Sequence, residues 1–195
     1  MRQHYKLMIL LAVLSMNGNA LAQTERFEFF TGYSALRNFS SGAVQHFDTM
    51  HGWNISLTMN IKPWIGITAD FGGNYNGRRL YLDIFFVNDE PVVGYREYKF
   101  MIHRGMVGPK VKLRNGRWEP FSHALFGVSR VSNEAMPPST EAGHETGFAW
   151  ALGGGLDLNL SERVKMRLIQ ADYMRSRTSL GGEGLRASFG LVFPL

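Results

Sequence analysis

Polar and apolar residues alternate in segment after segment of this chain, and this period of two constrains the fold more than any other feature. Residues 51–61 read HGWNISLTMNI, in which every second residue from Trp53 to Ile61 is apolar and Asn, Ser and Thr stand between them. Successive side chains of a β-strand point to opposite faces, so such a segment is a strand with one polar and one apolar face. The same alternation recurs at 27–35, 65–75, 148–160 and 185–193.

Three further segments have a less regular pattern. Residues 107–113 alternate, but the stretch before them has no clear phase, and the apolar residues of 118–130 fit either face. Residues 164–173 alternate with one phase slip, which predicts a β-bulge near Leu168–Ile169, because a bulge inserts one extra residue into a strand. Together these segments predict about eight strands, each close to the roughly 10 residues that a tilted membrane-spanning strand needs.

The connections between these segments alternate in length. Short connections lie at 61–64, at 114–117, which contains the hairpin signal Asn115-Gly116, and at 160–163. Long connections lie at about 37–50, 76–97, 131–146 and 176–184. Short turns at one end and long loops at the other are typical of an outer-membrane barrel with both termini in the periplasm.

The composition of the two faces favours a membrane barrel over a soluble one. The polar faces carry mainly Gly, Ala, Ser, Thr and Asn, which suit a crowded interior, and the apolar faces of the five regular segments carry no charged residue. A lipid-facing Arg or Lys at the bilayer midplane costs roughly 2–4 kcal/mol, which explains this absence. The expected fold is therefore an all-β, transmembrane, antiparallel up-and-down β-barrel of about eight strands. A soluble lipocalin-like binding barrel is the alternative.

The first 22 residues have the features of a secretory signal peptide. Arg2 and Lys6 precede an apolar run, and Ala20-Leu21-Ala22 places small residues where a signal peptidase cleaves. We expect a signal peptide at 1–22 and a barrel domain at 23–195. The whole chain has 21 Lys and Arg residues, and without Arg2 and Lys6 the barrel domain has 19, against 16 acidic residues. This excess of positive charge is small and gives no reason to expect a nucleic-acid partner.

Several charged residues fall on the polar faces and are expected inside the barrel. They are Glu28, Asp70, Asp157 and Asp172, together with Lys110, Lys112, Lys165, Arg167 and Arg186. Buried charges need partners, so we expect a network of ion pairs and hydrogen bonds that fills the lumen. A narrow ion pathway is the alternative, but eight strands leave an interior only just wide enough for side chains.

The chain resembles the small OmpA-like outer-membrane β-barrel family over its whole mature length. The resemblance is carried by FTGYS at 30–34, GWN at 52–54, GGGLD at 153–157, IQADY at 169–173 and the alternating final strand. It implies a bacterial outer-membrane location and insertion by the barrel-assembly machinery, which recognises a final strand such as the one that contains Phe189, Leu191 and Phe193. It also implies contact with outer-membrane lipid and lipopolysaccharide.

No residues form a pattern typical of an active site, and no enzymatic activity is expected. The nearest approach is Ser122 beside His123 and Glu119, but neighbours in a strand point to opposite faces. Four other histidines are scattered without the spacing of metal ligands. We therefore expect no catalytic residue, no metal and no cofactor. A lipid A-modifying enzyme is a less favoured alternative.

The segment 78–100 is the best candidate for a partner site. It contains two apolar stretches around the turn Asn88-Asp89-Glu90-Pro91, which predicts a hairpin that projects beyond the membrane. The candidate contact residues are Arg78, Arg79, Tyr81, Phe85 and Phe86, with the two arginines placed to meet lipopolysaccharide phosphates. Two alternatives remain open: the neighbouring strands simply extend and pair, or the two segments span the membrane in a ten-stranded barrel.

The expected function is that of a monomeric outer-membrane protein with a structural or surface-interaction role. Its lumen is filled by side chains and its long loops are exposed outside the cell. The alternative function is a narrow porin-like channel.

Overall fold

The computed structural model describes residues 26–39, 49–76, 79–87, 90–114, 116–136, 143–178 and 182–195. The expected signal peptide at 1–22 and Arg78 lie outside the described residues, so the signal peptide stays a prediction. Within the described ranges, no helix is long and apolar enough to cross a membrane.

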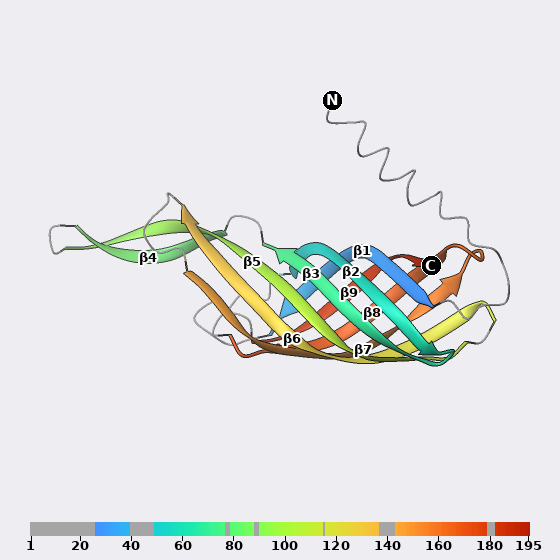
Figure 1. Cartoon of the computed structure of the whole chain (residues 1–195). Helices are drawn as coiled ribbons and strands as arrows, with labels where there is room; N and C mark the ends of the chain where they lie inside the picture. Colours follow the sequence, from blue (N-terminus) through green and yellow to red (C-terminus); the bar gives the residue numbers. More distant parts are fainter. Residues whose placement is uncertain are drawn as a thin grey trace, which may run out of the picture.

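The described residues form β-strands joined by turns and loops (Figure 1). In chain order the strands are β1 (Phe27–Asn38), β2 (Thr49–Lys62), β3 (Ile65–Tyr75), β4 (Arg79–Val87), β5 (Glu90–Lys112), β6 (Trp118–Met136), β7 (Gly143–Asn159), β8 (Lys165–Ser176) and β9 (Glu183–Pro194).

Eight of these strands close into an antiparallel barrel. The pairing order is β3-β2-β1-β9-β8-β7-β6-β5, and an additional pairing of β3 with β5 closes the ring. The first and last strands pair from Glu28↔Pro194 to Asn38↔Gly184, so both ends of the barrel domain are held in the sheet. The expectation of an all-β, antiparallel barrel of about eight strands is confirmed.

The ninth strand, β4, lies outside the barrel. It pairs only with the first part of β5, from Arg79↔Tyr98 to Val87↔Glu90, whereas the second part of β5 pairs with β3 from Met101 onwards. Figure 1 shows this hairpin projecting from the end of the barrel opposite the C-terminus. The projecting hairpin is therefore confirmed, and the ten-stranded alternative is wrong because β4 has no barrel neighbour other than β5. We call the hairpin end the outer end, and the end with the C-terminus the inner end.

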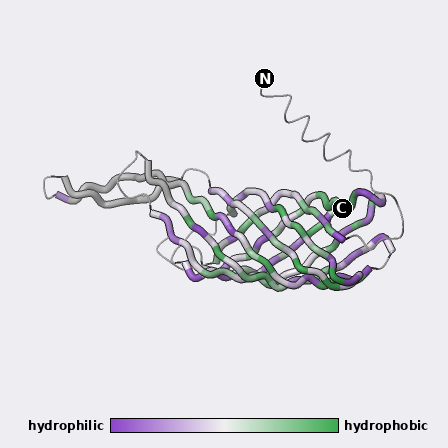
Figure 2. The backbone as a smooth tube through the Cα atoms, viewed as in Figure 1, coloured by the Kyte–Doolittle hydropathy of each residue, from purple (hydrophilic) through white to green (hydrophobic). Residues whose placement is uncertain are grey.

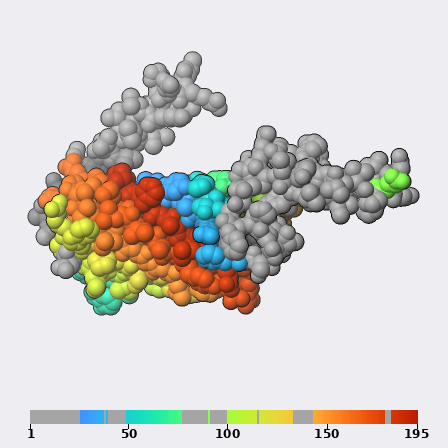
Figure 3. Space-filling model, turned by 180° about the vertical axis from the view of Figure 1, so that it is seen from behind, coloured from blue at the N-terminus to red at the C-terminus, as the bar shows by residue number. Residues whose placement is uncertain are grey.

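The apolar face of each regular strand points out of the barrel and the polar face points in. In β2, Trp53 and Leu57 are 40% and 44% exposed, whereas Asn54, Ser56 and Thr58 are at most 3% exposed. Hydrophobic and hydrophilic residues accordingly alternate along the barrel strands (Figure 2). Seen from behind, the strands form a continuous wall (Figure 3). An apolar exterior around a polar interior is the arrangement of a membrane barrel rather than of a soluble one.

The irregular segment in β8 contains the expected bulge. Leu156 pairs with Ile169 and Asp157 pairs with Arg167, which leaves Leu168 without a partner in the ladder. Leu168 and Ile169 are both exposed, while Arg167 and Gln170 on either side of them are both buried. The phase slip in the sequence is therefore one extra outward-facing residue.

The ambiguous segment 118–130 forms most of β6. Glu119, Phe121, His123 and Leu125 are buried, and the residues between them face outward. Apolar residues thus occupy both faces of this strand, which is why its sequence alone did not indicate an orientation.

The expected tight turn between β5 and β6 is also present. Gly116 has a φ of 62°, in the left-handed region that favours glycine, and the strands pair on both sides of it.

Candidate functional site

Three buried lysines surround one carboxylate at the inner end of the lumen. The Glu28 carboxylate accepts hydrogen bonds from Lys112 Nζ at 2.6 Å and Lys165 Nζ at 3.1 Å, and Lys110 Nζ lies 3.8 Å away. Lys165 also donates to Glu119 at 2.9 Å. These residues come from β1, β5, β6 and β8, and each ion pair of the cluster (β1 with β5, β1 with β8, β6 with β8) joins strands that are not neighbours in the barrel wall.

Arg167 on β8 lies between two aromatic rings inside the lumen. Its guanidinium carbon is 4.2 Å from the ring centroid of Phe30 and 4.3 Å from that of Phe121. It donates to Asp157 at 2.8 and 3.1 Å and to Gln170 at 2.6 Å. A cation over an aromatic face is stabilised by the ring quadrupole, most strongly where water is excluded.

A second network at mid-height is centred on Arg186 and Asp172. The Arg186 guanidinium donates to Asp172 at 2.8 Å and to Asp70 at 2.7 Å, which joins β9 to β8 and to β3 across the lumen. Asp172 also bonds His123 at 2.7 Å and accepts from Gln170 at 2.8 Å. All of these side chains are buried, so each charge is compensated by direct partners rather than by water.

The backbone of β7 makes room for this network at Gly153. A Cβ atom at this position would lie 2.0 Å from Oδ1 of Asp172 and 2.4 Å from the backbone oxygen of Ala171. The glycine therefore allows the Asp172 carboxylate to pack directly against the backbone of the neighbouring strand.

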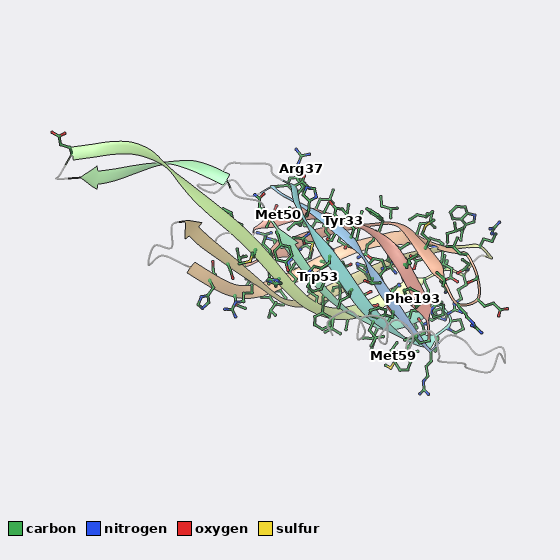
Figure 4. The ribbon with its side chains drawn as sticks, turned by 90° about the horizontal axis from the view of Figure 1, so that it is seen from above. Tyr33, Arg37, Met50, Trp53, Met59 and Phe193 are labelled. Carbon is green, nitrogen blue, oxygen red and sulfur yellow. The ribbon has the colours of Figure 1, made fainter. Side chains whose placement is uncertain are left out.

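The outer half of the lumen holds an apolar cluster among the buried polar side chains of Ser34, Asn74, Arg104 and Ser129. This cluster, which we call the apolar seal, consists of Leu36, Met50, Ile102, Met106, Leu125, Val131, Ala151 and Met174. Figure 4 places Met50 toward the outer end, whereas Met59 and Phe193 lie toward the inner end. Most buried charges of the described lumen thus lie toward the inner end and at mid-height, whereas the apolar seal and Arg104 lie above them.

The structure places all nine sequence-predicted lumen charges inside the barrel. Glu28, Lys110, Lys112 and Lys165 meet at the inner end, Asp157 pairs with Arg167, and Asp70, Asp172 and Arg186 meet at mid-height. Three buried ionisable residues were not predicted: Arg104, Glu119 and His123. They lie in the two segments whose alternation has no clear phase, so the sequence carried no signal for their orientation.

The nearest approach to a catalytic group does not assemble. His123 is buried and bonds Asp172, while Ser122 is exposed on the outer face of the same strand. Glu119 bonds Lys165 and Asn159. Among the described residues, no group of three His, Asp or Glu side chains is arranged to hold a metal ion.

Four of the candidate contact residues lie in the projecting hairpin. Arg79, Tyr81, Phe85 and Phe86 belong to β4, and Arg78 lies outside the described residues. The backbone register pairs Tyr81 with Arg96 and Phe85 with Val92.

Aromatic residues mark two levels on the outer surface of the barrel. Trp64 and Trp118 are 51% and 49% exposed at the inner end. Toward the outer end, Trp53 Nε1 donates to the Tyr75 hydroxyl at 3.2 Å, and that hydroxyl bonds His103 at 3.0 Å. Aromatic side chains with polar tips suit the two interfaces between lipid and water.

Comparison with known proteins agrees with this geometry. A family model described as "Outer membrane protein beta-barrel domain" matches residues 8–193. No curated protein matches the chain.

Solved structures of small outer-membrane barrels are similar in fold. Ail, the attachment invasion locus protein of Yersinia pestis, is 15% identical with a TM-score of 0.56, over 86% of this chain and 96% of that one. Neisserial surface protein A is 12% identical with a TM-score of 0.59, over 87% of this chain and 97% of that one. Ail has also been solved in complex with the heparin analogue sucrose octasulfate, and that structure is 14% identical with a TM-score of 0.57, over 86% of this chain and 96% of that one.

Proposed function

The chain belongs to the outer membrane protein β-barrel domain family, and from this premise we propose that it is a monomeric, non-conducting barrel that presents the β4–β5 hairpin as a surface-interaction element. Membership of the family implies a bacterial outer-membrane location. Within this proposal the barrel is the anchor and the hairpin is the functional part.

The observation that carries the proposal is the length of β5. This strand has 23 residues, whereas β3, with which it closes the barrel, has 11. A tilted strand needs about 9–11 residues to cross the membrane, so roughly half of β5 is not required for spanning. The excess pairs with β4 and projects at the outer end.

The composition of the hairpin favours a partner with apolar surface over a polyanion. Residues 78–99 contain four basic residues (Arg78, Arg79, Arg96, Lys99) and four acidic residues (Asp83, Asp89, Glu90, Glu97), so their formal net charge is zero. The same stretch includes LYLDIFFV at 80–87, an apolar run of the kind that marks interaction sites when it projects from a protein.

Binding of whole cells to coated beads tests this role. Cells that display the wild-type protein are expected to bind octyl-coated beads and not heparin-coated beads. The double variant Phe85→Asp with Phe86→Asp is expected to lose octyl binding, whereas Glu90→Gln, an exposed control at the hairpin tip, retains it. Equal binding by wild-type and double-variant cells, at equal surface amounts, would refute the hairpin as the interaction element.

Lipopolysaccharide is proposed as the lipid partner around the outer end. His103 and Arg130 are directly opposite each other on β5 and β6, and both are exposed on the lipid-facing side. Together with Arg78 and Arg79 they provide cations that suit phosphate groups. We also propose insertion by the barrel-assembly machinery, and the alternating burial pattern of β9 supports this proposal.

The alternative functions receive less support from the site. The packing of the lumen opposes a narrow channel, because an eight-stranded barrel is only just wide enough for side chains and the described interior is filled by them. The opposite orientations of Ser122 and His123 oppose a lipid-modifying hydrolase.

A further inference from the structure

Among the described residues, one buried cation inside the barrel has no carboxylate partner, whereas the other buried cations each have one. The described interior holds six buried basic residues (Arg104, Lys110, Lys112, Lys165, Arg167, Arg186) and five buried carboxylates (Glu28, Asp70, Glu119, Asp157, Asp172). Five of the six cations lie within 4 Å of a carboxylate oxygen. Arg104 is the exception among the described residues.

Arg104 makes few contacts for a guanidinium. It is 7% exposed, it donates to the Asn74 side-chain oxygen, and its Nε has no hydrogen-bond partner in the described part of the chain. A guanidinium has five N–H donors and no acceptor, and a buried charge without partners is strongly disfavoured. The remaining donors therefore call for an acceptor that the described side chains do not supply.

A small cavity lies beside Arg104 at the outer end of the lumen. Its volume is about 10 Å³, and it is partly open. This is about the space that one small occupant of the size of a water molecule requires. It is lined by Leu36, Arg104, Ser129, Ala149, Met174, Arg175, Ser176, Gly182 and Gly184.

The lining of this cavity suits an anion. It contains no carboxylate, and Ser129, which lies directly opposite Arg104 on β6, adds a hydroxyl that can donate. The second arginine of the lining, Arg175, is 59% exposed and pairs with Glu183 at 3.4 Å. Arg104 is therefore the cation of the lining whose positive charge is left for a bound anion. The side chains of Leu36, Ala149 and Met174 supply the apolar part of the wall and reduce the contact of a bound ion with bulk water.

We infer that this cavity is a binding site for a small monovalent anion of the halide class, held by the Arg104 guanidinium and the Ser129 hydroxyl. One bound anion brings the buried acidic and basic charges of the described interior into balance. The bound anion would also fill the cavity above the mid-height network.

Thermal unfolding of the detergent-extracted barrel in different salts tests the site. At constant ionic strength, the midpoint of the heat-dependent gel shift is expected to be higher in chloride or bromide than in gluconate. An anion that binds only the folded state lowers the unfolding constant by the factor 1 + [anion]/Kd, which is about 11-fold at ten times Kd.

Matched arginine variants identify the residue responsible. Arg104→Gln is expected to abolish the difference between chloride and gluconate, whereas Arg163→Gln, at an exposed position in the turn between β7 and β8, is expected to retain it. Retention of the full chloride effect in Arg104→Gln would overturn the assignment.

Diffraction from wild-type crystals grown in bromide provides a test that does not depend on the folding of a variant. An anomalous peak beside the Arg104 guanidinium is the expected result. No bromide peak, together with equal midpoints in chloride and gluconate, would show that the cavity holds water only and would overturn the inference.

Discussion

Arg167 shows at the scale of single residues why the lumen departs from a simple division into polar and apolar faces. Its guanidinium lies between Phe30 and Phe121, two large apolar side chains that point into the barrel. The rule that polar residues face inward predicted the position of Arg167 but not of its aromatic partners. Cation–π contacts depend on three strands that meet in space, which no periodicity within one strand can indicate.

A substitution at Arg186 tests the mid-height network. Arg186→Met leaves Asp70 and Asp172 buried without their shared cation, and removal of one partner from a buried ion pair costs roughly 3–5 kcal/mol. The free energy of unfolding in urea, followed by tryptophan fluorescence, is expected to fall by about this amount. The exposed control Arg130→Met should leave it nearly unchanged; an equal loss in both variants would contradict the network.

Neighbouring residues of β2 test the assignment of the two faces. Leu57→Arg places a charge on the lipid-facing side and should cost roughly 2–4 kcal/mol, which blocks stable insertion. Ser56→Ala, directly beside it but facing the lumen, should insert normally. The fraction of protein that shows a heat-dependent mobility shift measures the outcome, and equal tolerance of both substitutions would contradict the orientation.

At the scale of elements, the strands differ in how far their sequences determine them. The faces of β1, β2, β3, β7 and β9 followed from alternation because most of their lumen positions carry small or polar residues, with large apolar exceptions such as Phe30 and Leu36. The face of β6 did not, because Phe121 and Leu125 fill the lumen while Phe126 and Val128 face outward. The position of β4 also remained open, because a projecting hairpin and a pair of membrane-spanning strands can have the same apolar composition. The two arrangements differ only in which strands β4 pairs with, and the sequence does not indicate this.

Single-residue deletions test the bulge in β8. Deletion of Leu168 removes the extra residue and keeps every other side chain of β8 on its present face, so the stability change should stay within about 2 kcal/mol. Deletion of Ala187 from the regular strand β9 turns one half of that strand over, since a shift by one residue exchanges the faces. The first variant should give a heat-modifiable barrel and the second should not. Failure of both would mean that Leu168 is not a bulge residue.

At the scale of the whole molecule, the barrel combines a closed wall, a charged interior and an apolar seal at the outer end. The ion pairs join strands across the lumen, so they stabilise the cross-section of the barrel as well as compensate the buried charges. The apolar seal lies between this charged interior and the outer surface. A barrel whose described interior is filled by packed side chains suits the proposed role of an anchor, and the element that projects from it is the β4–β5 hairpin.

Conductance in planar lipid bilayers tests this account most directly. The wild-type protein, reconstituted at an amount verified by its heat-modifiable mobility, is expected to give no channel steps above the bare bilayer. Regular, ohmic steps that scale with salt concentration would contradict a lumen closed by the apolar seal, and would identify the protein as a narrow channel.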